Sequence, residues 1–267
     1  MNKPLQMPMF SPETEWVPPL SLPDLKEYSE IAIDLETRDP NLMTMGSGAI
    51  RGDGEIVGIA VAVEGWSGYF PIAHEAGGNM DRGLVLDWFE EVLHTDATKI
   101  FHNAMYDVSW IRSLGFQIRG GIIDTMIAAS LVNENRFSFT LDSISKEYIG
   151  MGKNEKTLAE AAKAWGVNPK ADMWRLPAPL VGEYAERDAE VTLKLWQAMK
   201  HEITQQDLWD IFNLETNLFP CLVDMKFKGV RVDIDKAEIL KKDLNSQEKI
   251  IHQKIEKLSG FPIEIYA

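Results

Sequence analysis

The apolar and polar positions change period along the chain, and each period predicts a different element. Short apolar runs bounded by glycine or polar residues predict strands at 30–35, 55–63, 68–72, 99–101 and 122–123. Apolar residues recurring at helical spacing predict helices at 82–94, 103–114, 124–132, 140–149, 157–165 and 180–202. Three strands followed by strand–helix alternation are typical of an α/β fold with a mixed sheet flanked by helices.

The two ends of the chain have a different character. Residues 1–29 are rich in proline and show little periodicity, which predicts an N-terminal arm laid over the domain. Residues 207–228 and 236–258 predict two amphipathic helices on either side of a short non-helical stretch at 229–233. We therefore expect one α/β domain at 30–205 and a C-terminal helical extension at 206–267.

Composition narrows the class of protein. The chain has 267 residues, 45% of them hydrophobic, so it can bury a full core. A single cysteine, Cys221, excludes a disulfide framework and a cysteine metal site, and it fits a reducing compartment. No apolar run reaches the ~18 residues of a membrane span, and the first residues lack an apolar leader, which predicts a soluble cytoplasmic protein. A net charge of −14 argues against extensive coating of DNA, but not against an enzyme that grips a few phosphates through metal ions.

Three short acidic clusters stand where carboxylates are costly. Asp34 and Glu36 follow the apolar run 31–33, and residues two apart on a strand face the same side. Asp107 lies four residues after Asn103 on a predicted helix, and Asp188 interrupts an apolar stripe on another. Buried carboxylates cost several kcal/mol unless a cation compensates them.

If these four carboxylates converge, they form an oxygen-rich site with four negative charges. Two divalent cations would neutralise it, and oxygen ligands are those that Mg²⁺ and Mn²⁺ prefer. The pattern therefore predicts a two-metal phosphodiester site with two Mg²⁺ or Mn²⁺ ions as cofactors.

The spacing within the clusters also resembles a known family. Ile33–Thr37, Asn103 with Tyr106 and Asp107, and Tyr184 with Asp188 are similar to the three motifs of DEDD superfamily 3′–5′ exonucleases, tyrosine subtype. Residues 124–126 and 141–143 resemble the proofreading domain of polymerase I-type (family A) DNA polymerases, and 225–233 resembles the opening of their polymerase domain. The resemblance implies an RNase H-like fold at 30–205, the helical start of a polymerase domain at 206–267, and no polymerase active site in this chain.

The resemblance also implies a role for each residue. Asp34, Glu36 and Asp188 would bind the first ion, with Asp34 bridging to a second ion held by Asp107. Tyr184, with Glu36, would orient the attacking water, because a phenol of pKa about 10 is a poor base. The residues implied to contact substrate are Thr37, His102, Asn103, Tyr106 and Arg136.

The implied function is removal of nucleotides from single-stranded or frayed DNA 3′ ends during replication, in the cytoplasm of a bacterial cell or phage-infected host. A separate polymerase fragment is a candidate partner, and no membrane is involved. Two alternatives stay open: an exoribonuclease of the RNase D type, which shares the acids, and a catalytically silent module that braces a polymerase. Asp124 is interpreted as a helix N-cap in preference to a metal ligand, and His74 as a loop histidine.

Overall fold

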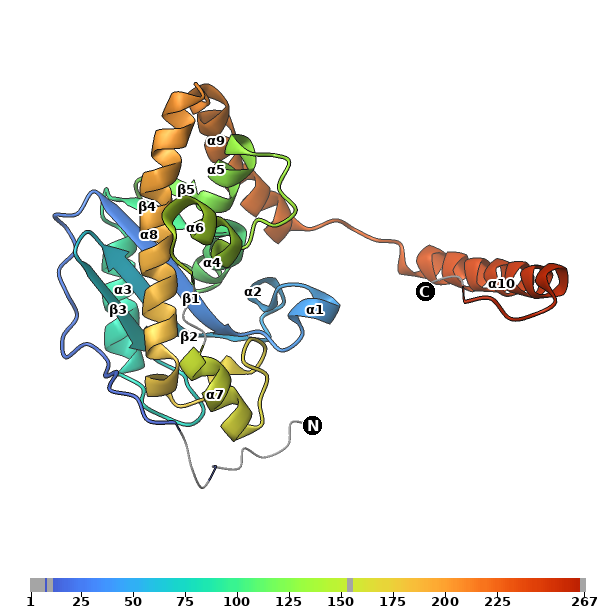
Figure 1. Cartoon of the computed structure of the whole chain (residues 1–267), viewed down its shortest axis with the longest axis horizontal. Helices are drawn as coiled ribbons and strands as arrows, with labels where there is room; N and C mark the ends of the chain where they lie inside the picture. The colour runs from blue at the N-terminus through green and yellow to red at the C-terminus, as the bar shows by residue number, and fades with distance from the viewer. Residues whose placement is uncertain (1–7, 9–11, 153–155, 265–267) are drawn as a thin grey trace. The chain divides into compact units, whose positions relative to one another are not determined.

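The computed structural model describes residues 8, 12–152 and 156–264 (Figure 1). The chain divides into two compact units, one ending at Asp224 and the other beginning at Met225. The first unit contains the sheet and all four carboxylates of the acidic clusters.

The sheet has five strands in the order β3-β2-β1-β4-β5. Their bounds are β1 Glu30–Arg38, β2 Glu55–Val63, β3 Trp66–Pro71, β4 Thr98–Phe101 and β5 Ile122–Asp124. β1, β2 and β3 pair as an antiparallel meander, whereas β4 and β5 join β1 in parallel. The mixed sheet predicted from the sequence is confirmed.

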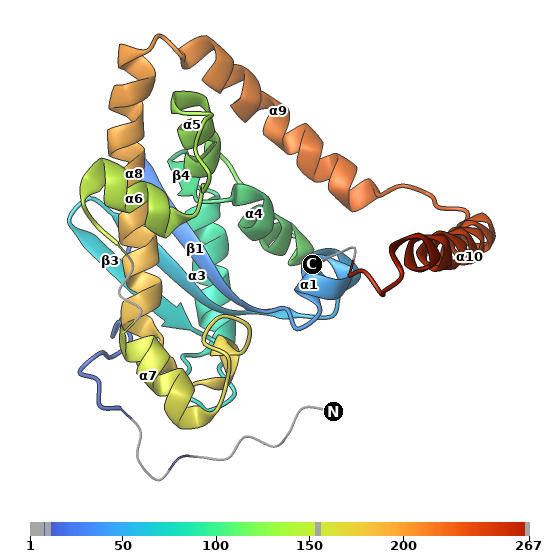
Figure 2. The same cartoon turned by 45° about the vertical axis from the view of Figure 1, so that its right-hand side comes forward.

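The two faces of the sheet carry side chains of different size. The face that holds Asp34 also presents Ala60 and Ala62 of β2, and these pack in one cluster with Ala185 and Ala189 of helix α8 (Gly182–Gln205). On the opposite face the ring of Phe70 lies 4.3 Å from that of Trp88 on helix α3 (Arg82–Leu93). Because small residues let a helix approach a sheet closely, α8 lies tightly across the strands (Figures 1 and 2).

The remaining helices of the first unit follow the strands. Their bounds are α1 Leu42–Met45, α2 Gly48–Arg51, α4 Ala104–Ser113, α5 Thr125–Val132, α6 Leu141–Ile149, α7 Lys156–Trp165 and α9 Trp209–Lys228, with 3₁₀ turns η1 Met173–Arg175 and η2 Ala178–Leu180. Helix α9 runs past Asp224, the last residue of this unit. Helices α1 and α2 and both 3₁₀ turns were not predicted, because elements of three or four residues are too short to show a period.

The first unit extends beyond residue 205, where the sequence suggested a boundary. Phe212 of α9 is buried and stacks on Trp196 of α8, with ring centroids 5.5 Å apart. Trp209 meets the Phe212 ring edge-on at 5.8 Å. This aromatic cluster joins the start of α9 to the core, so the compact unit ends at Asp224.

The second unit consists chiefly of α10 (Ile234–Ser259), which begins at the N-cap Asp233 and ends before Gly260. None of its residues is buried, as expected for a helix whose apolar positions have no cover within the described structure. No helix in the described ranges is both long and apolar enough to cross a lipid bilayer.

The predicted N-terminal arm is described from residue 12 onward and at residue 8. Its contacts with the domain include a hydrogen bond of 2.8 Å from Trp88 Nε1 to the Pro23 carbonyl, and the Trp16 ring lies 6.0 Å from that of Tyr69. The other arm residues, 1–7 and 9–11, lie outside the described ranges.

Candidate active site

The first acidic cluster lies on the central strand. Asp34 and Glu36 of β1 pair with Ala60 and Gly58 of β2, and paired residues of an antiparallel ladder face the same side. Both carboxylates therefore project toward α8 over a lane of small residues. A register shift between Glu36 and Thr37 ends the regular ladder directly after the second carboxylate.

The second cluster meets the first through one hydrogen bond. β4 runs parallel to β1 and delivers the chain to α4, whose first turn holds Asp107, exposed by only 5%. Asp107 Oδ1 accepts a hydrogen bond of 3.0 Å from the backbone N–H of Leu35, which lies between Asp34 and Glu36. Burial and the nearby charge of Asp34 raise the pKa of Asp107 well above its usual range, although the Leu35 hydrogen bond acts in the opposite direction.

A fifth carboxylate, Asp124, positions the helix that carries Asp107. It is the N-cap of α5 and accepts from Met126 N at 2.8 Å, as predicted. It also accepts from Asn103 N at 2.9 Å and Ala104 N at 2.8 Å, so one buried carboxylate caps the starts of both α4 and α5. Its second role was not foreseen, because it depends on the parallel pairing of β4 with β5.

The third cluster reaches the first from across the sheet. On α8, Tyr184 and Asp188 are exposed by only 9% and 2%. Burial, then the charges of Asp188, Glu36 and Asp34, raise the pKa of Tyr184, and its hydroxyl hydrogen-bonds to Asp188. The carboxylates of the first and third clusters thus act on the same phenol.

The donor chemistry of this site fits divalent cations. Four carboxylates supply hard oxygen ligands, and two of them are almost fully buried, where negative charge is unfavourable without a compensating cation. In the described part of the chain, no three Asp, Glu, His or Cys side chains already adopt a geometry that could hold a metal ion.

Two of the residues implied to contact substrate are joined directly. The Thr37 and Tyr106 hydroxyls lie 2.6 Å apart, and the Tyr106 ring meets Trp110 edge-on at 6.3 Å. Burial raises the pKa of Tyr106 to about 12, although the Thr37 hydrogen bond lowers it. Asn103 is exposed and has the left-handed backbone conformation, with φ of 64°, at the turn into α4.

The other two such residues are engaged within the protein. His102 is hydrogen-bonded at both ring nitrogens, to Thr125 Oγ1 at 2.8 Å and to the Phe139 carbonyl at 3.0 Å. Arg136 forms an ion pair with Glu147 and donates to the Ser138 carbonyl at 3.2 Å, and its side chain is only 7% exposed. As placed, both residues hold the loop between α5 and α6.

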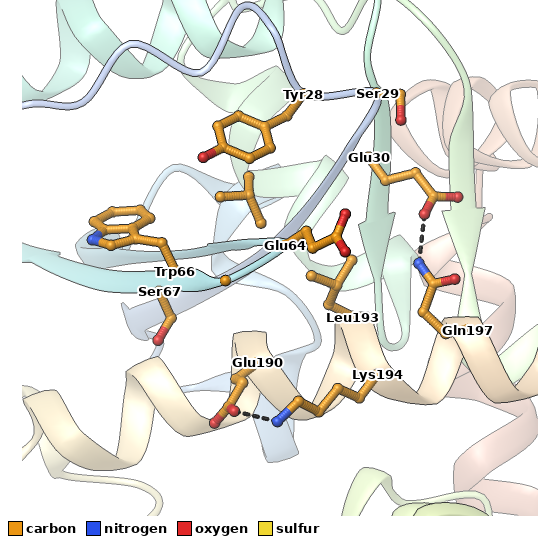
Figure 3. A pocket seen from close by; sticks show the side chains of 12 residues that line it. Tyr28, Ser29, Glu30, Glu64, Trp66, Ser67, Glu190, Leu193, Lys194 and Gln197 are labelled. Atoms are coloured by element: carbon orange, nitrogen blue, oxygen red, sulfur yellow. Dashed lines mark hydrogen bonds and ion pairs between the residues drawn. The ribbon is translucent and has the colours of Figure 1, made fainter.

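A well-formed surface pocket lies away from these residues. Its volume is about 580 Å³, and it opens at the start of β1, beside the β2–β3 turn and α8 (Figure 3). Glu30 accepts from Gln197 at 2.6 Å and forms an ion pair with Lys200 at 2.9 Å. Glu190 forms an ion pair with Lys194 at 2.5 Å, so both carboxylates are neutralised by lysines. None of the predicted site residues lines this pocket.

Comparison with known proteins decides the family. The 3′–5′ exonuclease domain family matches residues 21–204, which include all three acidic clusters. The chain belongs to this family. It is a 3′–5′ exonuclease domain of the kind found in family A DNA polymerases, a class of metal-dependent phosphodiester hydrolases, as the sequence motifs indicated.

Relatives and solved structures agree with this assignment. The DNA-directed DNA polymerase of Pseudomonas phage M6 is 34% identical over 274 residues, an alignment that covers 98% of this chain and 40% of the relative. The chain thus spans about two fifths of that relative. The POL domain of Pol1 from M. smegmatis, solved with DNA primer-template and dNTP, superposes with a TM-score of 0.60 at 17% identity, covering 91% of this chain and 36% of that one.

A nuclease of similar size shares the fold. NrnC of Brucella melitensis, solved with bound Mg²⁺, superposes with a TM-score of 0.56 at 19% identity, covering 77% of this chain and 89% of that one. At such identities the likeness shows the fold alone, and it confirms the RNase H-like sheet expected from the sequence.

Proposed function

We propose that this chain removes nucleotides from the 3′ ends of single-stranded or frayed DNA with two Mg²⁺ or Mn²⁺ ions, as the proofreading part of a family A DNA polymerase. The observation that carries this proposal is the Leu35–Asp107 hydrogen bond of 3.0 Å, which joins the first and second acidic clusters. Helix α8, which carries the third cluster, packs on the face of β1 and β2 that holds Asp34 and Glu36. The charges of these two carboxylates also contribute to the raised pKa of Tyr184.

The carboxylates divide between two ions in this proposal. Asp34, Glu36 and Asp188 would hold one ion, and Asp107, with Asp34, would hold the other. Bound ions would lower the pKa of a water molecule and stabilise the leaving 3′ oxygen. Asp107 lies in the first turn of α4 with Leu35 N–H on one of its oxygens, and the proposal assigns the other oxygen to the ion.

Tyr184 orients the attacking water and does not deprotonate it. Its raised pKa keeps the phenol protonated at neutral pH, so the hydroxyl can donate a hydrogen bond or accept one but carries no negative charge. Glu36, whose charge reaches the same hydroxyl, is the second group that directs the water.

Substrate contacts follow from the exposed side of the site. Tyr106, fixed by Thr37 and Trp110, would present its ring to the terminal base, and exposed Asn103 would hydrogen-bond to the terminal nucleotide. His102 and Arg136 would contact the strand only by exchanging present partners, such as the Phe139 carbonyl and Glu147. With a net charge of −14, the protein grips few phosphates directly and depends on the ions for the rest.

The polymerase context and the setting are parts of the same proposal. M. smegmatis Pol1 was solved with DNA primer-template, and relatives of this chain are phage polymerases. We therefore infer that residues 206–267 begin a polymerase domain or contact a polymerase polypeptide, in a bacterial cell or phage-infected host.

A digestion assay tests the proposed function. Oligonucleotides of the same sequence in DNA and RNA, labelled at the 5′ end, are incubated with the purified chain and Mg²⁺. Stepwise shortening of the DNA, lost in Asp34→Asn and retained in the exposed-site control Asp87→Asn, is the expected result. Faster digestion of RNA would favour the exoribonuclease, and a folded protein inactive on both would favour the structural module.

A further inference from the structure

Tyr69 of β3 is joined by its backbone to the helix that carries the third acidic cluster. The residue is fully buried, and its N–H donates to Glu186 Oε1 on α8 at 3.1 Å. Glu186 lies between Tyr184 and Asp188 in the sequence. The strand and the catalytic stretch of the helix are therefore tied at this point.

The side chain of Tyr69 is also linked, through His74, to the segment that precedes α8. Tyr69 Oη lies 2.7 Å from His74 Nε2, and His74 Nδ1 lies 2.9 Å from the Leu176 carbonyl oxygen. Because a carbonyl oxygen only accepts, Nδ1 carries the proton, and Nε2 accepts the hydrogen bond from the Tyr69 hydroxyl. Burial lowers the pKa of His74 to about 4, so the neutral ring persists at pH 7. Leu176 lies in the segment that leads into α8.

The ring of Tyr69 also packs against Gly58 of β2, the strand that pairs with β1 beside the first cluster. Gly58 pairs with Glu36, and a Cβ atom on Gly58 would lie 2.0 Å from Tyr69 Oη. Only glycine fits there, so the phenol lies directly over the neighbour of Glu36. Burial and then the charges of Glu36 and Asp34 raise the pKa of Tyr69.

We propose that Tyr69 and His74 are positioning residues that fix the spacing between the β1 carboxylates and the α8 residues Tyr184 and Asp188. The inference rests on the proposed nuclease function. A buried hydroxyl and imidazole are costly to desolvate, and phenylalanine would fill most of the Tyr69 volume without that cost. Hydrogen bonds differ from apolar packing in having direction. The hydrogen bonds from Tyr69 through His74 to Leu176 fix the segment that leads into α8, and the one from Tyr69 N–H to Glu186 fixes α8 itself over the sheet. Neither residue needs to touch substrate.

A conservative variant of Tyr69 tests this role in the whole 267-residue chain. Tyr69→Phe keeps the ring and removes only the hydroxyl. We expect kcat on single-stranded DNA to fall about fivefold to tenfold, the effect of one hydrogen bond, with KM changed less than about twofold. Calorimetric titration of Mn²⁺ into the chelator-treated protein should show affinity weakened by about fivefold. Tyr28→Phe, two residues before β1 begins, is the matched control and should leave all three quantities unchanged.

His74 supplies the second comparison. His74→Gln retains an acceptor for the Tyr69 hydroxyl, whereas His74→Leu removes the partners of both Tyr69 and Leu176, so kcat should fall in the order native, Gln, Leu. A role in folding alone would lower the melting temperatures but leave kcat per folded molecule and Mn²⁺ affinity at native values, and that result would overturn the inference. Retained activity in Asp34→Asn would instead overturn the proposed function, and the Mn²⁺ affinities would still test the positioning role.

Discussion

The backbone N–H of Leu35 donates a 3.0 Å hydrogen bond to Asp107 Oδ1, across 72 residues of sequence. A strand amide normally pairs within its ladder, and here it anchors a carboxylate on a helix. Because Leu35 lies between Asp34 and Glu36, its hydrogen bond holds a third carboxylate beside two others without using either of their side chains. The same arrangement concentrates negative charge, which has consequences for stability.

Asp107→Asn should stabilise the metal-free protein. Asparagine keeps the shape and an acceptor for Leu35 N–H but removes a buried charge. Relief on the order of 1 kcal/mol corresponds to a melting temperature higher by about 2–4 °C in chelator at pH 7. Asp87→Asn on α3, which is exposed, is the control and should shift the melting temperature little.

The gain from Asp107→Asn should depend on pH. The pKa of Asp107 is raised in the folded state, so its stabilising contribution is full below the unfolded pKa of about 3.9 and is lost as pH rises through the folded value. The difference in melting temperature between the variant and the native protein should therefore be small near pH 4 and grow toward pH 7. A constant difference across that range would show that the charge of Asp107 is not its cause.

Divalent cations should offset the repulsion between the clustered carboxylates and so stabilise the native protein. Ions that bind only the folded state raise its stability by mass action, so Mg²⁺ or Mn²⁺ should increase the melting temperature in proportion to the logarithm of concentration above Kd. Asp34→Asn, which removes the bridging ligand, should reduce that shift strongly. Chelation should abolish digestion of DNA, and full activity in excess chelator would contradict the two-metal mechanism.

Substitutions of Tyr184 and Asp188 should reduce the nuclease activity to different extents. Asp188→Ala removes an ion ligand and should nearly silence the nuclease. Tyr184→Phe leaves the carboxylates in place and removes one orienting hydroxyl, so kcat should fall by about 10–1000-fold. Single-turnover digestion separates the two, and equal, negligible effects would place the site elsewhere.

The structural features that the sequence predicted correctly are those determined by neighbouring residues in the chain. The strand at 55–63 was predicted with the bounds the structure has, because Gly and polar residues delimit an uninterrupted apolar run. The N-cap role of Asp124 also follows from local sequence. The acidic clusters were grouped by motif spacing, and the structure supplies the Leu35–Asp107 contact that spacing alone does not contain.

The features that were not predicted come from contacts between distant segments. The hydrogen bond that joins Tyr69 to α8 could not be predicted from local sequence, because its partner Glu186 is 117 residues away. Arg136 was assigned to phosphate from its motif position, and its ion pair with Glu147 depends on how the loop before α6 folds back. The domain boundary near 205 follows a change of composition and coincides with the end of the family match at residue 204, and it stays a prediction. The packing of Phe212 on Trp196, which joins the start of α9 to the compact unit ending at Asp224, could not be foreseen from it.

That packing leads to a prediction about truncation. A chain ending at Asp224 keeps Phe212, Phe219 and Val223, the buried residues of α9, and every carboxylate of the site. Its melting temperature and its activity on short single strands should stay close to those of the full chain. A chain ending at 205 removes Phe212 and exposes the face of Trp196, and loss of a large buried aromatic costs about 3–5 kcal/mol. It should therefore melt at least several degrees lower and aggregate more readily, although all metal ligands remain. If the chain ending at Asp224 folds with native stability yet loses nuclease activity, residues 225–267 contribute to the site, and the assignment of all catalytic groups to the first unit is wrong.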